Sequence, residues 1–448
     1  MNKKIRQITI IIIFAILILF NNTVMPVKNE LSDLDLIKVV GLDVINEGIY
    51  KVQHTNVKVN DTDQSSSGGG GGSSGGGSSG GQSSQGQGQG QGQSGNKIEE
   101  NEENDKIFSV KAATFSDAVR AFQTYTNKNM SGSHVKFFLF GENLAKNDIS
   151  ESIDFNVRDY EVRKNALVFI TKGTSARDFL DEATRGSYPV DEKLQSMTKN
   201  NEAKGVSYKT TLTDALRIIS SCSGAGLIPT IKIIDNEEIK NSQKEDPRQD
   251  TSNSIIDKQT AIPITDDIFF DYDGFGVIKD GKLIGYLDRE QSFTANLLTN
   301  KLQGSNINIY LGENQTVSCG ITLSLTKYKF KFDENDNISE ISINTMFRDN
   351  IEDIYAKDYK IDDKFIKDLE KKQSQQIKAR IEDLITKIRE FNADFLNIKD
   401  VFKQSHPYKY RKIEDKWNEQ LMNAKITVEV ESNIQRTYDI TGLYTEEK

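Results

Sequence analysis

Two short stretches of the sequence come close to motifs that bind phosphate or calcium. Residues 276–283 read GVIKDGKL and carry Leu283 where a phosphate-binding loop needs Ser or Thr to hold magnesium. Residues 333–344 begin DENDN like a calcium loop, but Ile338 replaces the glycine of position six and Asn344 replaces the glutamate of position twelve. Both stretches therefore predict turns between strands, the first at an Asp-Gly hairpin.

The other residue types that carry out catalysis are scattered. His54, His134 and His406 have no spacing that suits a metal site, and no G-x-S-x-G hydrolase motif occurs. With 66 Asp and Glu residues, carboxylate pairs arise by chance, so nothing favours a glycosidase pair. The sequence thus predicts no catalytic residue, no metal ligand and no cofactor.

Cys222 and Cys319 lie far apart and outside any C-x-x-C motif, which favours two buried thiols. A disulfide between them stays open as an alternative if the fold brings them together. Trp417 lies in RKIEDKWNEQL, which predicts a short amphipathic helix, and we expect its ring to pack in the core rather than stack on a ligand. The net charge of −9 argues against general nucleic-acid binding.

The N-terminal residues predict a membrane-targeting segment over 1–27. Basic residues precede an apolar run from Ile8 to Phe20, which fits a signal peptide better than a full span of ~20 residues. The residues directly after the run, up to residue 31, contain neither an A-x-A cleavage site nor a cysteine. Cleavage and retention both stay open; we favour an uncleaved anchor. Either way, the rest of the chain is expected outside the cytoplasmic membrane.

The elements that follow predict a layered fold. Residues 37–59 predict two strands, whereas the Gly/Ser/Gln-rich stretch 65–95 has no apolar residue and predicts a disordered insertion over about 61–106. From residue 108 onward, helical and strand patterns alternate, and a long helix is expected from about residue 362 to 395. We expect an α+β fold of mixed or antiparallel sheets packed with helices.

Three domains are expected after the N-terminal segment: domain 1 over 28–204, domain 2 over 205–316 and domain 3 over 317–448. The insertion falls in a loop of domain 1, where added length costs little because the entropy of loop closure grows only logarithmically.

The order of several segments resembles the Ger(x)C family, the C subunits of nutrient germinant receptors in endospore-forming bacteria. Segment 30–44 resembles the start of the mature family chain, 133–180 its central signature, 274–288 its second-domain hairpin and 391–421 its C-terminal signature. The residues that carry the match, with no role assigned to them, are His134, Arg158, Asp159, Gly285, Leu287, Asp394, Pro407 and Trp417.

The resemblance implies a non-catalytic, three-domain protein at the outer face of the spore inner membrane. It would work with integral membrane A and B subunits in a complex that responds to small nutrients and triggers germination. Family members are typically lipoproteins, and here residues 20–31 contain no cysteine for the lipid. Two other functions stay open: an extracytoplasmic solute-binding protein, which would have a polar-lined cleft, and a cell-wall hydrolase that uses two carboxylates.

Overall fold

A computed structural model describes most of the chain after residue 33. It covers residues 34–46, 49–58, 106–112, 129–186, 188–221, 224–234, 269–312, 315–355 and 362–435, with isolated positions between 114 and 124. The apolar run near the N-terminus and the Gly/Ser/Gln-rich stretch lie outside these residues, as does the end of the chain after residue 435. Among the described helices, none is both long and apolar enough to cross a bilayer.

The first sheet contains nine strands in the order β3-β2-β1-β5-β6-β7-β8-β9, with the short β4 paired to β1. Its centre is parallel, since β1, β5, β6 and β7 pair in parallel, and its two sides are antiparallel. The strands are β1 Leu34–Asn46, β2 Ile49–Lys58, β3 Lys106–Ala112, β4 Asn129–Ser131, β5 Phe137–Gly141, β6 Leu167–Thr171, β7 Ala225–Ile234, β8 Phe269–Lys279 and β9 Lys282–Leu287.

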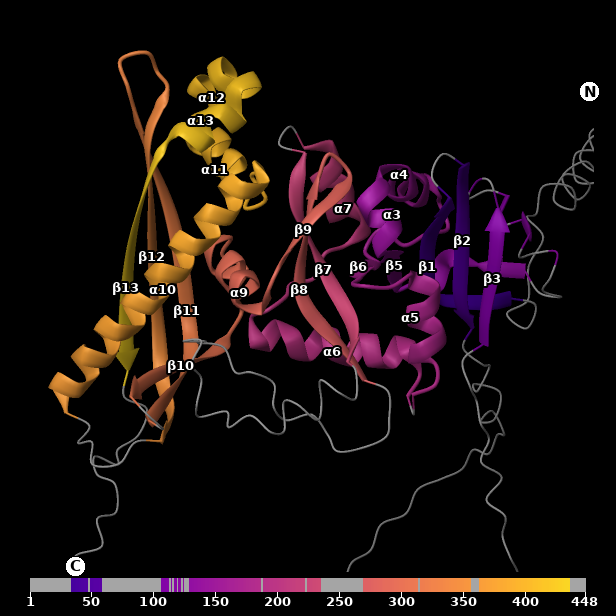
Figure 1. Ribbon diagram of the computed structural model, residues 1–448, viewed down its shortest axis with the longest axis horizontal. Coiled ribbons are helices and arrows are strands. Elements are labelled where there is room, and N and C mark those ends of the chain that lie inside the picture. Colours follow the sequence, from indigo (N-terminus) through magenta and orange to yellow (C-terminus); the bar gives the residue numbers. More distant parts are fainter. Residues whose placement is uncertain are drawn as a thin grey trace, which may run out of the picture.

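Helices cover both faces of this sheet because its central strands are apolar on both sides. Along β5, Phe138 and Phe140 pack into one core while Phe137 and Leu139 pack into another. The first core receives α3 (Glu142–Asn147), α4 (Ser150–Arg158) and α7 (Leu212–Ser220). The second receives α5 (Ala176–Ala183) and α6 (Val190–Lys204), and Figure 1 labels these helices around the strands of the sheet.

The second sheet is smaller, with the order β10-β11-β12-β13. The first three strands are antiparallel, and β13 pairs in parallel with β12. One long helix, α10, crosses this sheet (Figure 1). The elements of this part are α9 Arg289–Leu298, β10 Ser305–Gly312, β11 Gln315–Phe332, β12 Ile338–Tyr355, α10 Asp363–Phe391, α11 Ile398–Ser405, α12 Pro407–Ile413, η3 Glu414–Lys416, α13 Trp417–Asn423 and β13 Lys425–Gln435.

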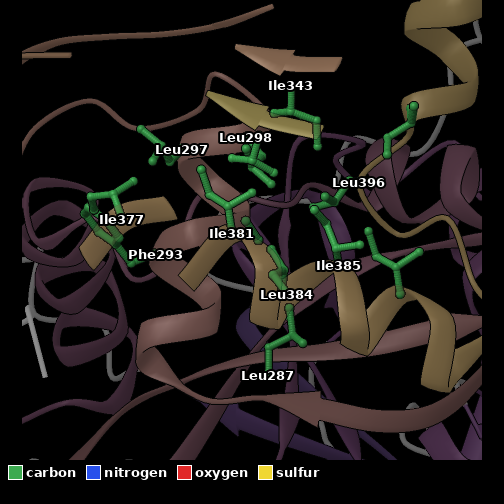
Figure 2. Packing of buried hydrophobic residues seen from close by; sticks show 14 of the residues in the cluster. Leu287, Phe293, Leu297, Leu298, Ile343, Ile377, Ile381, Leu384, Ile385 and Leu396 are labelled. Carbon is green, nitrogen blue, oxygen red and sulfur yellow. The ribbon is translucent and has the colours of Figure 1, made fainter. Parts of the chain in front are cut away.

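The largest core joins the two sheets. On α10, Ile377, Ile381 and Leu384 are buried at helical spacing, as the sequence predicts. Figure 2 shows them facing Ile343 of β12 and the α9 residues Phe293, Leu297 and Leu298, with Leu287 of β9 at the same interface. This continuous core couples the C-terminal sheet to the last strands of the first sheet.

These elements confirm the predicted α+β class. The Asp-Gly turn has φ of 49° at Asp280 and 78° at Gly281, which is a tight hairpin between β8 and β9 and not a phosphate loop. The DENDN turn closes on Asp333, whose Oδ1 accepts from the amides of Asn335 and Asn337. The long helix ends at Phe391, a few residues before the expected end, because Asn392 adopts a left-handed conformation.

The predicted domain boundaries stay a proposal. The first sheet continues past residue 205, since β7, β8 and β9 complete it, and the second sheet starts with β10 at Ser305. Apolar and polar residues alternate over 425–442 and predict two strands, of which the second lies outside the described residues. Residues 114–128 predict a capped helix with Phe115, Val119 and Phe122 on one face, and these three side chains also lie outside the described residues. The predicted cap of that helix is present: the Asp117 amide donates to Thr114 Oγ1 (3.1 Å).

Candidate functional site

Two of the eight family-motif residues meet in a buried site at the C-terminal end of α10. The chain turns back after Asn392 and buries Asp394 completely. Its Oδ1 accepts from the Ile398 amide (3.0 Å), and its Oδ2 accepts from the Lys399 amide (2.8 Å) and from Trp417 Nε1 (3.0 Å). Burial raises the pKa of Asp394, and the three donors oppose this rise because they favour the charged form.

This carboxylate fixes two helices at once. Two of its donors are backbone amides at the start of α11, where unpaired N–H groups and the helix dipole favour an anion. The third is the indole of the first residue of α13. Trp417 is 2% exposed and its ring stacks on Phe402 with centroids 5.4 Å apart, which confirms the expectation that it packs in the core. The geometry is that of a structural clamp.

An aromatic layer extends from this clamp to α12. Phe402 also stacks on His406, with centroids 5.4 Å apart at 14°, and Phe330 and Phe332 of β11 lie edge-on to His406. Pro407 follows as the first residue of α12, where its missing N–H costs nothing, and it is exposed. Hence His406 is a packed core-edge residue.

Gly285 and Leu287 of β9 belong to the junction between the two sheets. A Cβ on Gly285 would lie 2.6 Å from ring atoms of Phe391, so only glycine lets the end of α10 approach this strand so closely. Leu287 is fully buried in the largest core. Both residues therefore serve packing between the halves of the molecule.

The other three motif residues lie on the first half of the molecule, where His134 and Arg158 are exposed and Asp159 is half-buried. His134 ends the 3-10 helix η2, Gly132–His134. Arg158 ends α4 and pairs with Asp154 one turn earlier, while Asp159 Oδ1 accepts from the Glu161 amide (2.9 Å). The structure thus does not bring the eight residues together. Asp394 and Trp417 meet in the clamp, Gly285 and Leu287 lie at the junction, and the other four lie apart from both sites.

A second buried carboxyl was not singled out from the sequence. Asp349 is fully buried and accepts a hydrogen bond from Gln373 Nε2 of α10, whose Oε1 accepts from Ser432 Oγ of β13 (2.6 Å). Burial raises the pKa of Asp349 to about 7, and nearby Glu370 contributes in the same direction. The sequence does indicate that Asp349 is buried, because it continues the inward-facing positions of β12, which are Ile341, Ile343, Thr345 and Phe347.

A third carboxyl, Asp43, fills the anion position at the start of α5. Its oxygens accept from the amides of Ala176 (2.8 Å) and Arg177 (2.9 Å). This helix start follows β6 and lies beside the carboxyl end of β5, where open α/β sheets commonly bind ligands. Here the Asp43 carboxylate accepts hydrogen bonds from the amides at the helix start, so the protein's own side chain occupies the position that a ligand would take.

Among the described residues, no group of three or more His, Cys, Asp or Glu has the geometry of a metal site. Cys319 is a free, buried thiol, and burial raises its pKa, which disfavours the nucleophilic thiolate. Cys222 and the pairing that would involve it lie outside the described residues.

Comparison with known proteins links both halves of the chain to one group. The family described as "Spore germination protein N-terminal domain" matches residues 78–233, and "Spore germination B3/GerAC like, C-terminal" matches residues 273–438. Spore germination protein KC of Bacillus subtilis (strain 168) is 24% identical over 348 residues, which cover 74% of this chain and 78% of that protein.

A solved structure shares the fold. The crystal structure of the GerBC protein matches 88% of this chain and 96% of its own with a TM-score of 0.50, at 15% sequence identity. The match extends over nearly the whole of that structure and shows that the two proteins share an overall fold.

Proposed function

Because this chain belongs to the Ger(x)C family, we propose that it is the C subunit of a nutrient germinant receptor and acts in spore germination. In this proposal it works with membrane-embedded A and B subunits, at the outer face of the spore inner membrane, and helps to convert nutrient binding into the germination signal. The observation that carries the proposal is the ordered match of an N-terminal and a C-terminal germination family along one chain.

We infer that the chain is not an enzyme. Its best-defined polar sites bind the protein to itself: Asp394 holds α11 and α13, and Asp43 holds α5. Both carboxylates accept hydrogen bonds from the protein's own backbone, and Asp394 also accepts one from an indole, so they serve the fold. The motif residues therefore serve a scaffold that presents surfaces to other subunits.

Co-purification tests the assembly directly. The full chain, tagged at its C-terminus, is extracted from spore membranes with detergent and its partners are identified by mass spectrometry. We expect multi-span membrane proteins to be enriched over an unrelated tagged protein of the same membrane. Recovery of the chain alone, from membranes in which it is abundant, would overturn the receptor-subunit proposal.

Deletion of the protein tests its role. We expect slower nutrient-triggered germination with normal sporulation, and recovery when the wild-type chain is restored. The responses should be compared over a panel of single nutrients, since one receptor answers only some of them. Unchanged rates for every nutrient, in a strain that lacks other receptor C subunits of this family, would contradict the proposal.

A further inference from the structure

Helix α12 presents a basic, aromatic face to solvent. Tyr410 and Ile413 point inward and are buried. Tyr408, Arg411 and Lys412, spaced i, i+3 and i+4, share the opposite face, and all three are exposed. We call these three residues the α12 face. Tyr408 is 80% exposed, and among the large apolar side chains of the described residues only Tyr160 is more exposed.

This face rests on a rigid base. Beneath it lie the stacked rings of Phe402 and His406, and Lys409 Nζ lies 3.6 Å from the ring centroid of Phe332. Tyr410 donates its hydroxyl hydrogen to Glu414 (2.8 Å). Tyr408 is therefore held outward by a packed helix, and its exposure is a fixed property of the fold.

The charge of this region differs from that of the whole chain. Residues 403–412 contain four basic residues and no acidic residue, in a protein of net charge −9. One acid from the β11–β12 turn reaches them: Asp336 pairs with Lys409 (2.7 Å) and Lys412 (2.8 Å). Asp400 and Asp415 are exposed on either side in the sequence, outside the basic stretch.

We propose that the α12 face docks on an anionic lipid surface. Exposed tyrosine is suited to the headgroup level of a bilayer, and flanking Lys and Arg are attracted to anionic headgroups. The proposal rests on the membrane association in the proposed function. Figure 1 places α12 at the top of the half that contains the second sheet and β2 and β3 in the other half, so the apolar run that precedes β1 and the α12 face would attach different halves of the molecule.

Attachment to the membrane at two points explains how a face of three residues can be sufficient to orient the protein. Once the N-terminal segment is in the membrane, docking of α12 is an intramolecular step with a high effective concentration of lipid. Attraction that would be weak for a free protein then orients the tethered chain, with its long axis along the membrane.

A site-specific probe tests this orientation in the full chain. Tyr408→Trp places a fluorophore on the face, and Tyr188→Trp is the matched control, since Tyr188 is 66% exposed on the loop between α5 and α6. The natural Trp417 is buried and contributes equally to both. Each protein is mixed with vesicles of brominated phosphatidylcholine, with or without phosphatidylglycerol. We expect quenching at least twofold greater for Tyr408→Trp than for the control, only with the anionic lipid, and reversed by 0.5 M salt.

Charge variants in the Tyr408→Trp protein sharpen the test. Arg411→Glu with Lys412→Glu should remove the extra quenching, and Asp336→Asn should increase it by releasing two lysines. Absent quenching, or equal quenching at both positions, overturns the lipid assignment. If the charge-reversed protein nevertheless loses germination, the face belongs to an acidic partner protein. These vesicles contain no other subunit, so the result is independent of the receptor proposal, which deletion and co-purification test.

Discussion

Asp394 and Asp349 are both fully buried in the C-terminal half, yet their surroundings differ. Asp394 accepts three hydrogen bonds from groups that the fold holds in place. Asp349 accepts one from the Gln373 side chain, and its Oδ1 has no hydrogen-bond partner among the described residues. Burial raises the pKa of both, and that of Asp349 reaches about 7.

The difference shows what makes a buried carboxyl structural. Burial disfavours the charged form at both sites, and only donors can offset that cost. At Asp394 the donors are two backbone amides and an indole, which favour the charged form against burial, so the group serves as a clamp. At Asp349 a single amide is available and Glu370 lies nearby, so this group gains a proton near neutral pH. We therefore expect a fixed site and a titrating site within one core.

Removal of the clamp should have the largest effect on stability. Asp394→Ala leaves three buried N–H donors without an acceptor, which costs about 3–5 kcal/mol of unfolding free energy. Urea denaturation of the full chain in detergent, followed by circular dichroism, measures the loss. Asp400→Ala, an exposed position on α11, is the matched control and should change little. A loss below about 1 kcal/mol for Asp394→Ala would show that water replaces the carboxylate.

The sequence predicts part of this clamp. The amphipathic pattern around Trp417 predicts its burial, and the resemblance marks Asp394, because both are local properties of the C-terminal signature. Their contact across 23 residues depends on the left-handed turn at Asn392 and on the paths of α11 and α12, which no local pattern specifies. Asp349 continues the inward-facing positions of β12, so its burial was predictable, but its partner Gln373 comes from the packing of α10.

The pH dependence of stability should distinguish the two carboxyls. Since the pKa of Asp349 is about 7 when folded and about 3.9 when unfolded, the folded protein binds the extra proton in between, and stability falls as pH rises through this range. Asp349→Asn removes this pH-dependent contribution to the unfolding free energy. We expect the unfolding free energy of the variant, relative to wild type, to rise by about 2–3 kcal/mol from pH 5 to pH 8.

The same urea titrations at pH 5, 6, 7 and 8 provide the measurement. Asp353→Asn, an exposed change on the same strand, should give a difference that does not vary with pH. If the difference in unfolding free energy for Asp349→Asn is also independent of pH, Asp349 does not change its protonation state between pH 5 and pH 8. The contrast between the two buried carboxyls would then be wrong.

Loss of one donor should move Asp394 toward the state of Asp349. Trp417→Phe keeps an aromatic ring in the stack but removes the indole N–H, at a cost of about 1–2 kcal/mol. A double-mutant cycle with Asp394→Asn should give a coupling of about 1 kcal/mol, whereas the cycle with Asp349→Asn should give almost none. Equal coupling to both carboxyls would indicate that Trp417 acts by filling space and not as a donor.

The smallest effect is expected at an exposed carboxyl, which completes the comparison. Two hydrogen bonds, from Lys409 and Lys412, hold the pKa of Asp336 at about 2, so it favours the folded state above about pH 4 and loses this contribution as pH falls toward 2. Solvent screens these pairs, so Asp336→Asn should shift the melting temperature at pH 7 less than Trp417→Phe does. The shift should shrink further in 0.5 M salt, while those of the buried carboxyls should not. If Asp336→Asn destabilises as much as Asp394→Ala, then number and rigidity of donors, rather than burial, would decide what a carboxyl contributes to this fold.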